Sequence, residues 1–382
     1  MTLGRFVLKN ALRNRRRTAL TMISIAFSLL LLTLMMTTWR SFFMDKGSPG
    51  SALRVITRHK VSLNFFMPKA YRERIRTIPG VVHIAQYNFY DGKYKDNRSE
   101  NFFMKFGTDP DEIFEVMTDW TIDPGQLKAW QRDQAGAIVE RRLAERMKWK
   151  IGQRVLLTGS LYGVNMDLTI RGIYDAPSGN SNLLFNYRYI EEVNRWANSQ
   201  SDLFVTRVES AEAVPRVMHA IDDMFRNSPQ PTKTETEKGF ELDFIAMMGN
   251  VKAFILSISL AVVFAILLVS GNTLAMSIRE RTREVAVLKT LGFTSQAILA
   301  MFVGEAVTMS LAGGLLGVLA CKGLVSVVVS SPEGMMLSAI TVTPLTLVVA
   351  LVVAALVGLV SAFIPSYRAS RLQIADGLRH VG

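Results

Sequence analysis

The sequence contains little cysteine and histidine and none of the common catalytic motifs. Its single cysteine, Cys321, excludes a disulfide within the chain. The four histidines are scattered and show no metal-ligand spacing such as H-E-x-x-H. There is no G-x-x-x-x-G-K-[ST] loop for nucleotide phosphates and no G-x-S-x-G turn for a nucleophilic serine. We therefore expect no catalytic residue, no metal site and no cofactor in this chain.

Charge is also missing, or nearly so, from four long apolar stretches. Because a helix needs about 20 apolar residues to cross the hydrocarbon core, these stretches predict membrane spans at 18–39, 253–278, 298–327 and 344–364. The first stretch is too long for the apolar core of a signal peptide and lacks a small-residue cleavage site, so we interpret it as an uncleaved anchor. Glu305 is the only acidic residue in the third stretch, which disfavours ion-driven transport.

The excess of basic residues lies outside the long middle segment. The chain has 44 Lys and Arg against 32 Asp and Glu, but the segment from Arg40 to Lys252 holds 30 basic and 27 acidic residues. The excess basic residues lie before the first span, between the second and third spans, and after the fourth span. Since loops rich in Lys and Arg stay in the cytoplasm, both termini are predicted inside and the middle segment outside. The basic charge is thus a topology signal, and no nucleic-acid partner is expected.

The middle segment, 40–239, shows alternating strand and helix patterns. Met166, Leu168 and Ile170 alternate as in a strand, for example, whereas 211–225 has helical spacing. The polar stretch 227–236 with two prolines is typical of a linker, and 240–252 predicts a helical stalk that runs unbroken into the second span. The predicted fold class is an α-helical membrane protein with four transmembrane helices and a large α+β extracytoplasmic domain between spans one and two.

The remaining segments are short. Residues 1–17 have the pattern of an amphipathic cytoplasmic helix, with a disordered basic tail as the alternative. Residues 328–343 predict a short outer loop. Pro365 is expected to end the fourth span and to begin a cytoplasmic tail, 365–382.

The charged stretch 279–294, RERTREVAVLKTLGFT, lies between the second and third spans. At helical spacing, Val287, Leu288 and Leu291 share a face with Glu284, and Gly292 is suited to end the helix. This pattern predicts a short amphipathic helix on the cytoplasmic membrane surface, able to contact a partner and pass its motion to the spans. The alternative is an ordinary basic loop that only sets topology.

The third span contains two further features. Gly313, Gly314 and Gly317 form a small-xxx-small pattern, which favours close packing of two transmembrane helices, although glycine is common in spans in any case. Glu305 is expected near the cytoplasmic interface. Pairing with a basic residue is the favoured interpretation of its position, and a proton relay is the alternative.

Four stretches resemble the MacB/FtsX-like permeases of ABC transporters, the type VII or mechanotransmission group. The stretch 277–305, SIRERTREVAVLKTLGFTSQAILAMFVGE, resembles the coupling segment of that family, and 365–379, PSYRASRLQIADGLR, resembles its closing motif. Residues 10–21 resemble its N-terminal cytoplasmic helix, and 136–174 its periplasmic core module. The layout of one span, a large outer insertion and three further spans is similar as well.

The resemblance implies a permease subunit in the bacterial inner membrane that does conformational work on a substrate at the outer face. It implies a dimer with a second permease copy or paralogue, and an ABC-type ATPase dimer that binds ATP and Mg²⁺. We expect that ATPase in a separate chain, because only about 17 residues precede the first span. A periplasmic adaptor or substrate-carrier protein is a further expected partner. The family's ATPase-coupling positions correspond here to Arg279, Arg281, Glu284, Lys289 and Gly292.

The substrate is left open as an amphipathic, peptide, drug or lipid-linked molecule that is exported or extracted. The alternative function is a membrane receptor whose outer domain senses a ligand and acts on a cytoplasmic partner. Its inner segments are too short to form an output domain of their own, so copurification distinguishes the two: an ATPase favours the permease and a kinase the receptor. A membrane enzyme would require an acid–base or metal cluster assembled in the folded outer domain.

Overall fold

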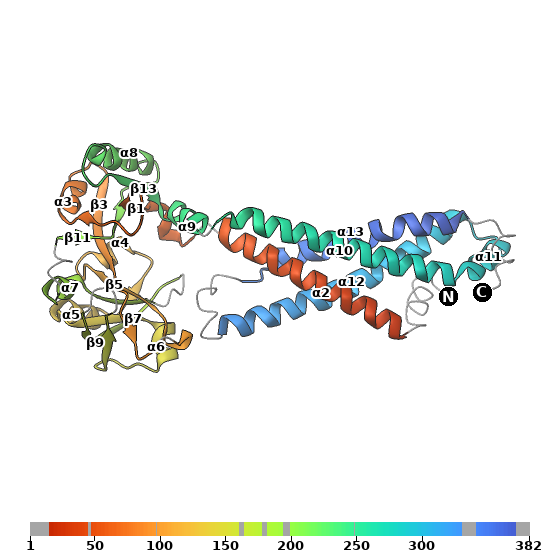
Figure 1. Cartoon of the computed structure of the whole chain (residues 1–382), viewed down its shortest axis with the longest axis horizontal. Helices are drawn as coiled ribbons and strands as arrows, with labels where there is room; N and C mark the ends of the chain where they lie inside the picture. Colours follow the sequence, from red (N-terminus) through yellow and green to blue (C-terminus); the bar gives the residue numbers. More distant parts are fainter. Residues whose placement is uncertain are drawn as a thin grey trace. The chain divides into compact units, whose positions relative to one another are not determined.

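The chain divides into two units, one of long helices and one built around a mixed sheet (Figure 1). The computed structural model describes residues 15–44, 47–96, 98–159, 164–177, 182–193, 199–247, 249–330 and 341–371. The helical unit holds the chain up to Met44 and most of it from Asn250 onward, and the sheet unit holds the segment between them. Each unit is described by itself below.

Among its described residues, the helical unit contains four helices that are long and apolar enough to cross a membrane, as predicted. They are α2 (Arg15–Trp39), which continues into the π-helical turn η1 (Arg40–Met44), α10 (Val251–Glu280), α12 (Ser295–Ser330) and α13 (Pro344–Ser370). A fifth, shorter helix, α11 (Thr282–Thr290), connects α10 to α12.

Glycines allow α12 to approach α2 closely. A Cβ on Gly317 would lie 2.3 Å from the backbone oxygen of Ala26, and one on Gly313 would lie 2.8 Å from Ile25. Gly314 faces α13, where a Cβ would come within 2.8 Å of Ala354. All three glycines of the small-xxx-small pattern therefore lie at helix–helix contacts that have no room for a side chain.

The fourth span does not end at Pro365, contrary to expectation. α13 continues to Ser370, so Pro365 lies inside the helix. Proline removes one hydrogen bond to the fourth preceding carbonyl, which belongs to Ser361, but it does not stop a helix whose later residues are held by packing. Ser366, Ala369 and Ser370 are buried and provide that packing.

The predicted unbroken stalk is also wrong. The segment forms two helices, α9 (Glu237–Met247) and α10, and Gly249 between them has a φ of +108°. That backbone conformation cannot continue a right-handed helix. Asn250 then begins α10, because its side chain accepts a hydrogen bond from the N–H of Ala253 at 3.1 Å.

Three predicted segments lie partly outside the described residues. Of the N-terminal helix 1–17 only 15–17 are described, as the first residues of α2. The outer loop 328–343 is described up to 330 and from 341, and the tail 365–382 up to 371.

The sheet unit has α+β architecture and lies between spans one and two, as predicted. Its main sheet has the strand order β13-β1-β12-β3-β5-β10-β7-β9-β8-β4, with β6 paired to β9. Only β5–β10 and β7–β9 are parallel pairs; the other described pairs are antiparallel. The strands are β1 (Arg54–His59), β3 (Val81–Phe89), β4 (Lys93–Tyr94), β5 (Met104–Thr108), β6 (Thr121–Ile122), β7 (Gly136–Glu140), β8 (Arg154–Thr158), β9 (Met166–Asp175), β10 (Asn182–Asn186), β12 (Leu203–Val208) and β13 (Thr232–Thr236).

Short helices cover this sheet and form its cores. The helices α3 (Ala70–Arg76) and α8 (Val214–Phe225) pack on β1, β3 and β12, whereas α6 (Arg141–Met147) packs beside β7 and β9. A third hydrophobic cluster, around Trp130 and Tyr174, connects the part of the sheet around β1, β3 and β12 to the part around β7 and β9. A two-stranded sheet, β2 (Met67–Pro68) with β11 (Gln200–Ser201), completes the described strands. The helices are η2 (Pro49–Leu53), α3 (Ala70–Arg76), η3 (Ser99–Asn101), α4 (Ile113–Val116), α5 (Pro124–Arg132), α6 (Arg141–Met147), α7 (Tyr187–Val193), α8 (Val214–Phe225) and α9.

The stretch predicted as a linker, 227–236, contains the edge strand β13. Thr232 and Thr234 are buried on one face, and the hydroxyl groups of Thr234 and Thr57 lie 3.1 Å apart. The run T-K-T-E-T alternates a β-branched residue with a charged one, which is a strand pattern. The two prolines that precede the strand obscured that signal.

Candidate functional site

The candidate site is the end of the helical unit where α10 turns into α11. Arg281 leaves the helical path between the two helices, and its N–H bonds to the carbonyl of Ile278 at 3.0 Å. Gly292, with φ +92°, ends the segment as expected: its N–H reaches Lys289 O, and the N–H of Phe293 reaches Leu288 O, both at 3.1 Å. The acidic Glu284 in the first turn and the basic Lys289 in the last suit the dipole of α11.

α11 packs on its own helical unit through a face that the sequence analysis did not single out. Val285 and Ala286 are buried, and Val285 packs with Ile298 and Phe302 of α12 and Ala369 of α13. α11 therefore packs against its own helical unit and does not place its Val287–Leu291 face there, because α12 and α13 supply an apolar surface that sequence periodicity does not reveal. Leu288 is partly buried against the same cluster.

The opposite face of α11 is open in the described structure. Val287 and Leu291 are 44% and 70% exposed, and Phe293, just after the helix, is 49% exposed. Arg283 lies one turn before Val287 and is exposed as well. The positions 283, 287 and 291 follow one another at four-residue spacing and so share one face of the helix. We call Arg283, Val287, Leu291 and Phe293 the exposed α11 face.

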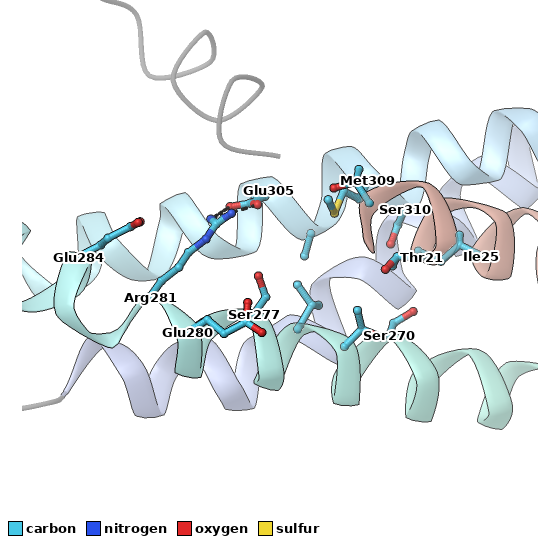
Figure 2. A pocket seen from close by; sticks show the side chains of 14 residues that line it. Thr21, Ile25, Ser270, Ser277, Glu280, Arg281, Glu284, Glu305, Met309 and Ser310 are labelled. Carbon is cyan, nitrogen blue, oxygen red and sulfur yellow. Dashed lines mark hydrogen bonds and ion pairs between the residues drawn. The ribbon is translucent and has the colours of Figure 1, made fainter. Parts of the chain in front are cut away.

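Glu305 pairs with Arg281, in agreement with the favoured interpretation that it has a basic partner. Nη1 of Arg281 lies 2.9 Å and 3.2 Å from the two carboxylate oxygens. Figure 2 shows the two side chains pointing toward each other. The two side chains are 16% and 7% exposed. The pair connects the α10–α11 junction to α12, so Arg281 extends into its own helical unit. Breaking such a pair leaves one buried charge without its partner.

A small polar cavity lies beside this ion pair (Figure 2). It has a volume of about 210 Å³ and is lined by residues of α2, α10 and α12 together with Arg281 and Glu284. The hydroxyl of Ser270 is buried and has no hydrogen-bond partner among the described residues. A polar cavity of this size offers the partners that water needs. The polar residues that line it include Thr21, Ser270, Ser277, Glu280, Glu305 and Ser310.

The five predicted coupling residues do not form one cluster. Arg281 and Glu284 line the polar cavity, Lys289 lies half-buried in the last turn of α11, and Gly292 is exposed just after it. Arg279 instead lines a separate groove between α10 and α13, together with Arg368, which the sequence interpretation did not single out.

A second group of charges, which sequence reasoning missed, lies in the sheet unit. Arg54 at the start of β1 is 2% exposed, and its guanidinium lies 2.5 Å from Asp119 and 2.5 Å from Glu237, the first residue of α9. Burial opposes ionisation of Asp119, but hydrogen bonds from Arg54 and Ser48 outweigh it and lower the pKa of that carboxyl.

Four positions farther along β1, Arg58 repeats this arrangement. It contacts Glu235 of β13 at 2.9 Å and Asp243 of α9 at 3.0 Å. Lys233 also pairs with Asp243. We call the pairs of Arg54 with Glu237 and of Arg58 with Glu235 and Asp243 the β1–α9 clamp. The even spacing of the two arginines places them on one face of the strand, which is the only signal for the clamp in the sequence.

Family models match almost all of the described chain. A MacB-like periplasmic core domain model matches residues 18–224, which is more than half of the chain. A model of the FtsX-like permease C-terminal region matches residues 254–374. The second match contains α11 and most of the helical unit, and the first contains most of the sheet unit.

Curated relatives align with parts of the chain. The uncharacterized ABC transporter permease YvrN of Bacillus subtilis is 38% identical over 112 residues, which is 28% of this chain and 26% of that protein. The macrolide export ATP-binding/permease protein MacB of Bdellovibrio bacteriovorus is 26% identical over 205 residues, 52% of this chain and 29% of the relative. The chain thus spans less than a third of the length of these relatives.

Two solved structures cover about half of the chain. The periplasmic region of MacB from Actinobacillus actinomycetemcomitans has a TM-score of 0.39 at 9% identity and covers 54% of this chain and 97% of that one. The extracellular domain of the transporter YknZ from Gram-positive bacteria has a TM-score of 0.36 at 10% identity, covering 48% and 99%. The two family-model matches decide the assignment: this chain belongs to the MacB/FtsX-like family of ABC transporter permeases.

Proposed function

We propose that the chain is the permease subunit of an ABC transporter and that the exposed α11 face docks a separate ATPase subunit, which binds ATP and Mg²⁺. The observation that carries this proposal is the uncovered pair Val287 and Leu291 on α11, with Arg283 on the same face. Apolar residues beside arginine are the composition expected of an interface centre.

The charge distribution supports a cytoplasmic location for this face. Arg279, Arg283 and Arg368 lie at the α11 end of the helical unit, and basic residues flank spans on the cytoplasmic side. With four spans, both termini then lie in the cytoplasm and the sheet unit outside. In a bacterium this membrane is the inner membrane.

The site is built to pass motion on from α11. Its inner face packs on α12 and α13, and the Arg281–Glu305 pair joins the same junction to α12. A displacement of α11 would therefore move several spans together, because packed helices behave as nearly rigid bodies. ATP-driven closure of the ATPase would then do work on a substrate at the sheet unit, outside the membrane.

The names of the relatives support export as the direction of transport. Several are called macrolide export ATP-binding/permease protein. We propose an amphipathic, peptide, drug or lipid-linked substrate, a second permease copy or paralogue beside this chain, and a periplasmic adaptor or substrate-carrier protein as a further partner.

Copurification of the full-length chain from mild detergent tests the proposal. We expect a P-loop ATPase to copurify with the wild type. Leu291→Glu should lower its recovery about tenfold or more, because an unpaired carboxylate buried in an interface costs several kcal/mol. Leu291→Met keeps an apolar side chain of similar size and serves as the matched control. Equal recovery with Leu291→Glu would show that α11 does not dock the ATPase, and a copurifying kinase would favour a receptor.

A further inference from the structure

A groove of about 560 Å³ runs between α10 and α13 and has no role in the proposed docking of the ATPase. Its volume lies within the range of sites that take drug-sized ligands. Phe264, Leu268 and Ile364 make it apolar along most of its length. Arg279 and Arg368 line its other end, and none of the described residues that line the groove is acidic. Figure 1 shows the two helices that form it.

We infer that this groove binds an anionic phospholipid, with the lipid phosphate on Arg279 and Arg368 and an acyl chain along the apolar part. Both arginines are exposed, and neither forms an ion pair with a described residue. Guanidinium groups bind phosphate oxygens with two parallel hydrogen bonds, and basic pockets between transmembrane helices are recognised sites for acidic lipid headgroups.

The length of the groove matches one leaflet. Phe264 and Arg279 are fifteen residues apart on α10, or about 22 Å of helix. One leaflet, from bilayer centre to the outer edge of the headgroups, is about 20–22 Å thick. A lipid whose phosphate contacts the arginines would therefore lay its acyl chain along the whole groove. The assignment to the cytoplasmic leaflet rests on the orientation in the proposed function.

Small side chains and a proline form the floor of the groove. Gly271 and Ala275 of α10 face Ser361 and Pro365 of α13. A Cβ on Gly271 would make ordinary contact, at 3.6 Å, with the backbone oxygen of Ser361. The groove is hollow because these residues lack bulk, and a larger side chain at position 275 would fill it.

Charge favours a lipid over a second copy of the chain in this groove. In a dimer with a twofold axis along the membrane normal, the same face of both subunits meets. The arginines of the two copies would also lie at the same depth in the membrane. Arg279 and Arg368 of one copy would then approach the same two residues of the other. Like charges at such close range repel, whereas an anionic lipid neutralises them.

Native mass spectrometry of the detergent-purified full-length protein tests the site. Dioleoyl phosphatidylglycerol is the probe, and dioleoyl phosphatidylcholine, with the same acyl chains, shows the binding that does not depend on net headgroup charge. We expect the wild type to retain phosphatidylglycerol preferentially. Arg368→Gln should weaken retention of phosphatidylglycerol about fivefold, and Arg279→Gln/Arg368→Gln should weaken it about fivefold again. Excess inorganic phosphate should not displace the lipid, since the acyl chain contributes to binding.

Two control variants separate the groove from general surface charge. Arg371→Gln makes the same charge change three residues beyond Arg368, outside the groove, where Arg371 stacks on Tyr367 at 4.8 Å; it should bind as the wild type does. Ala275→Leu keeps every charge but fills the groove, and it should weaken binding of both lipids.

Three results would overturn the inference. The first is unchanged phosphatidylglycerol retention by the double arginine variant, and the second is an equal loss with Arg371→Gln. The third is near-complete disulfide dimerisation of Ile364→Cys, in a Cys321→Ala background, within native membranes, which would place a second copy in the groove. None of these readouts involves the ATPase, so the lipid site and the proposed function can fail separately.

Discussion

Arg281 and Glu305 stabilise the helical unit only as a pair. Each side chain is mostly removed from solvent, so each has lost hydration that its partner must replace. The pair also connects two residues that are 24 positions apart in sequence. Removing one partner therefore lowers the stability of the helical unit more than removing both does.

Glu305→Gln should lower the free energy of unfolding of the helical unit by roughly 3 kcal/mol, because the largely buried Arg281 loses the opposite charge of Glu305. Arg281→Met/Glu305→Leu should recover most of that loss. Thermal unfolding in detergent measures both variants. If the double variant were as unstable as the sum of its single changes, the two residues would not act as a pair.

Asp202 predicts a pH dependence for the sheet unit. It is 4% exposed, and burial raises its pKa from 3.8 to about 7, although it accepts a hydrogen bond from the N–H of Phe89. Between pH 4 and 7 the folded state thus holds a proton that the unfolded chain has released. Stability should fall as pH rises through this window, because the unfolded state binds fewer protons.

Asp202→Asn should flatten that dependence, since the amide is neutral and its oxygen can still accept from Phe89. We expect the wild-type melting temperature of the sheet unit to drop more between pH 5 and pH 8 than that of the variant. Parallel pH profiles for the two proteins would show that another group titrates.

At the level of elements, α12 shows how glycines at different positions of one helix serve different purposes. Gly313, Gly314 and Gly317 face backbone or side-chain atoms of α2 and α13 at distances that exclude a Cβ. Gly304 and Gly323 on the same helix have no atom of a described residue within 4 Å of a Cβ position. The first group is required for helix contact, and the second is not.

Gly317→Ala should destabilise the helical unit by roughly 1–3 kcal/mol, because the new methyl group overlaps the backbone of α2, which cannot move aside alone. Gly304→Ala and Gly323→Ala should be neutral or stabilising by up to about 1 kcal/mol, since alanine favours the helix. Melting temperatures of the three variants in one detergent give the comparison. A uniform effect across them would mean that helix propensity alone decides.

Sequence patterns predicted elements well where burial follows from local composition. Charge-free runs located all four spans, and the alternation of Met166, Leu168 and Ile170 located β9. They failed where burial depends on distant residues. Periodicity did not indicate that Val285 packs on α12 and α13. β13 was missed because two prolines precede it and its pairing with β1 joins residues far apart in sequence.

The site was predictable to a similar degree. The resemblance indicated the segment, and the need for a basic partner of Glu305 followed from the cost of a charge in the membrane. That Arg281 is this partner, and that Arg279 lies apart from it, depends on the turn between α10 and α11. The β1–α9 clamp joins β1 to the distant stretch that forms β13 and α9, and it has no motif.

At the scale of the whole molecule, the sheet unit is held together by contacts between its first strand and its last helix. The sheet unit begins near β1 and ends with α9, and the β1–α9 clamp joins these two parts. All contacts of the clamp lie within this unit. The unit therefore has the features of an independently folding domain.

A fragment of residues 47–247 should fold by itself as a soluble domain, because it keeps β1, β13, α9 and the clamp. A shorter fragment, 47–231, should be largely unfolded. It keeps Asp119 beside Arg54 but loses Glu237 and both acidic partners of Arg58, together with the edge strand β13. A buried charge without its partner costs roughly 3–5 kcal/mol against a typical domain stability of about 5–15 kcal/mol. Circular dichroism melts of both fragments measure this. Equal melting temperatures would show that the clamp contributes no net stability.

The pairing of β1 with β13 has a mechanical consequence. Val55 at the start of β1 lies opposite Thr236 at the end of β13, so the chain enters and leaves the domain at the same end of one antiparallel ribbon. A force that moves both connections in the same direction carries the domain along without loading the ribbon. A force that pulls the connections apart acts on one hydrogen-bonded pair at a time, beginning at Val55 and Thr236. The ion pair between Arg54 and Glu237 lies at that end, so it would be the first contact to resist peeling.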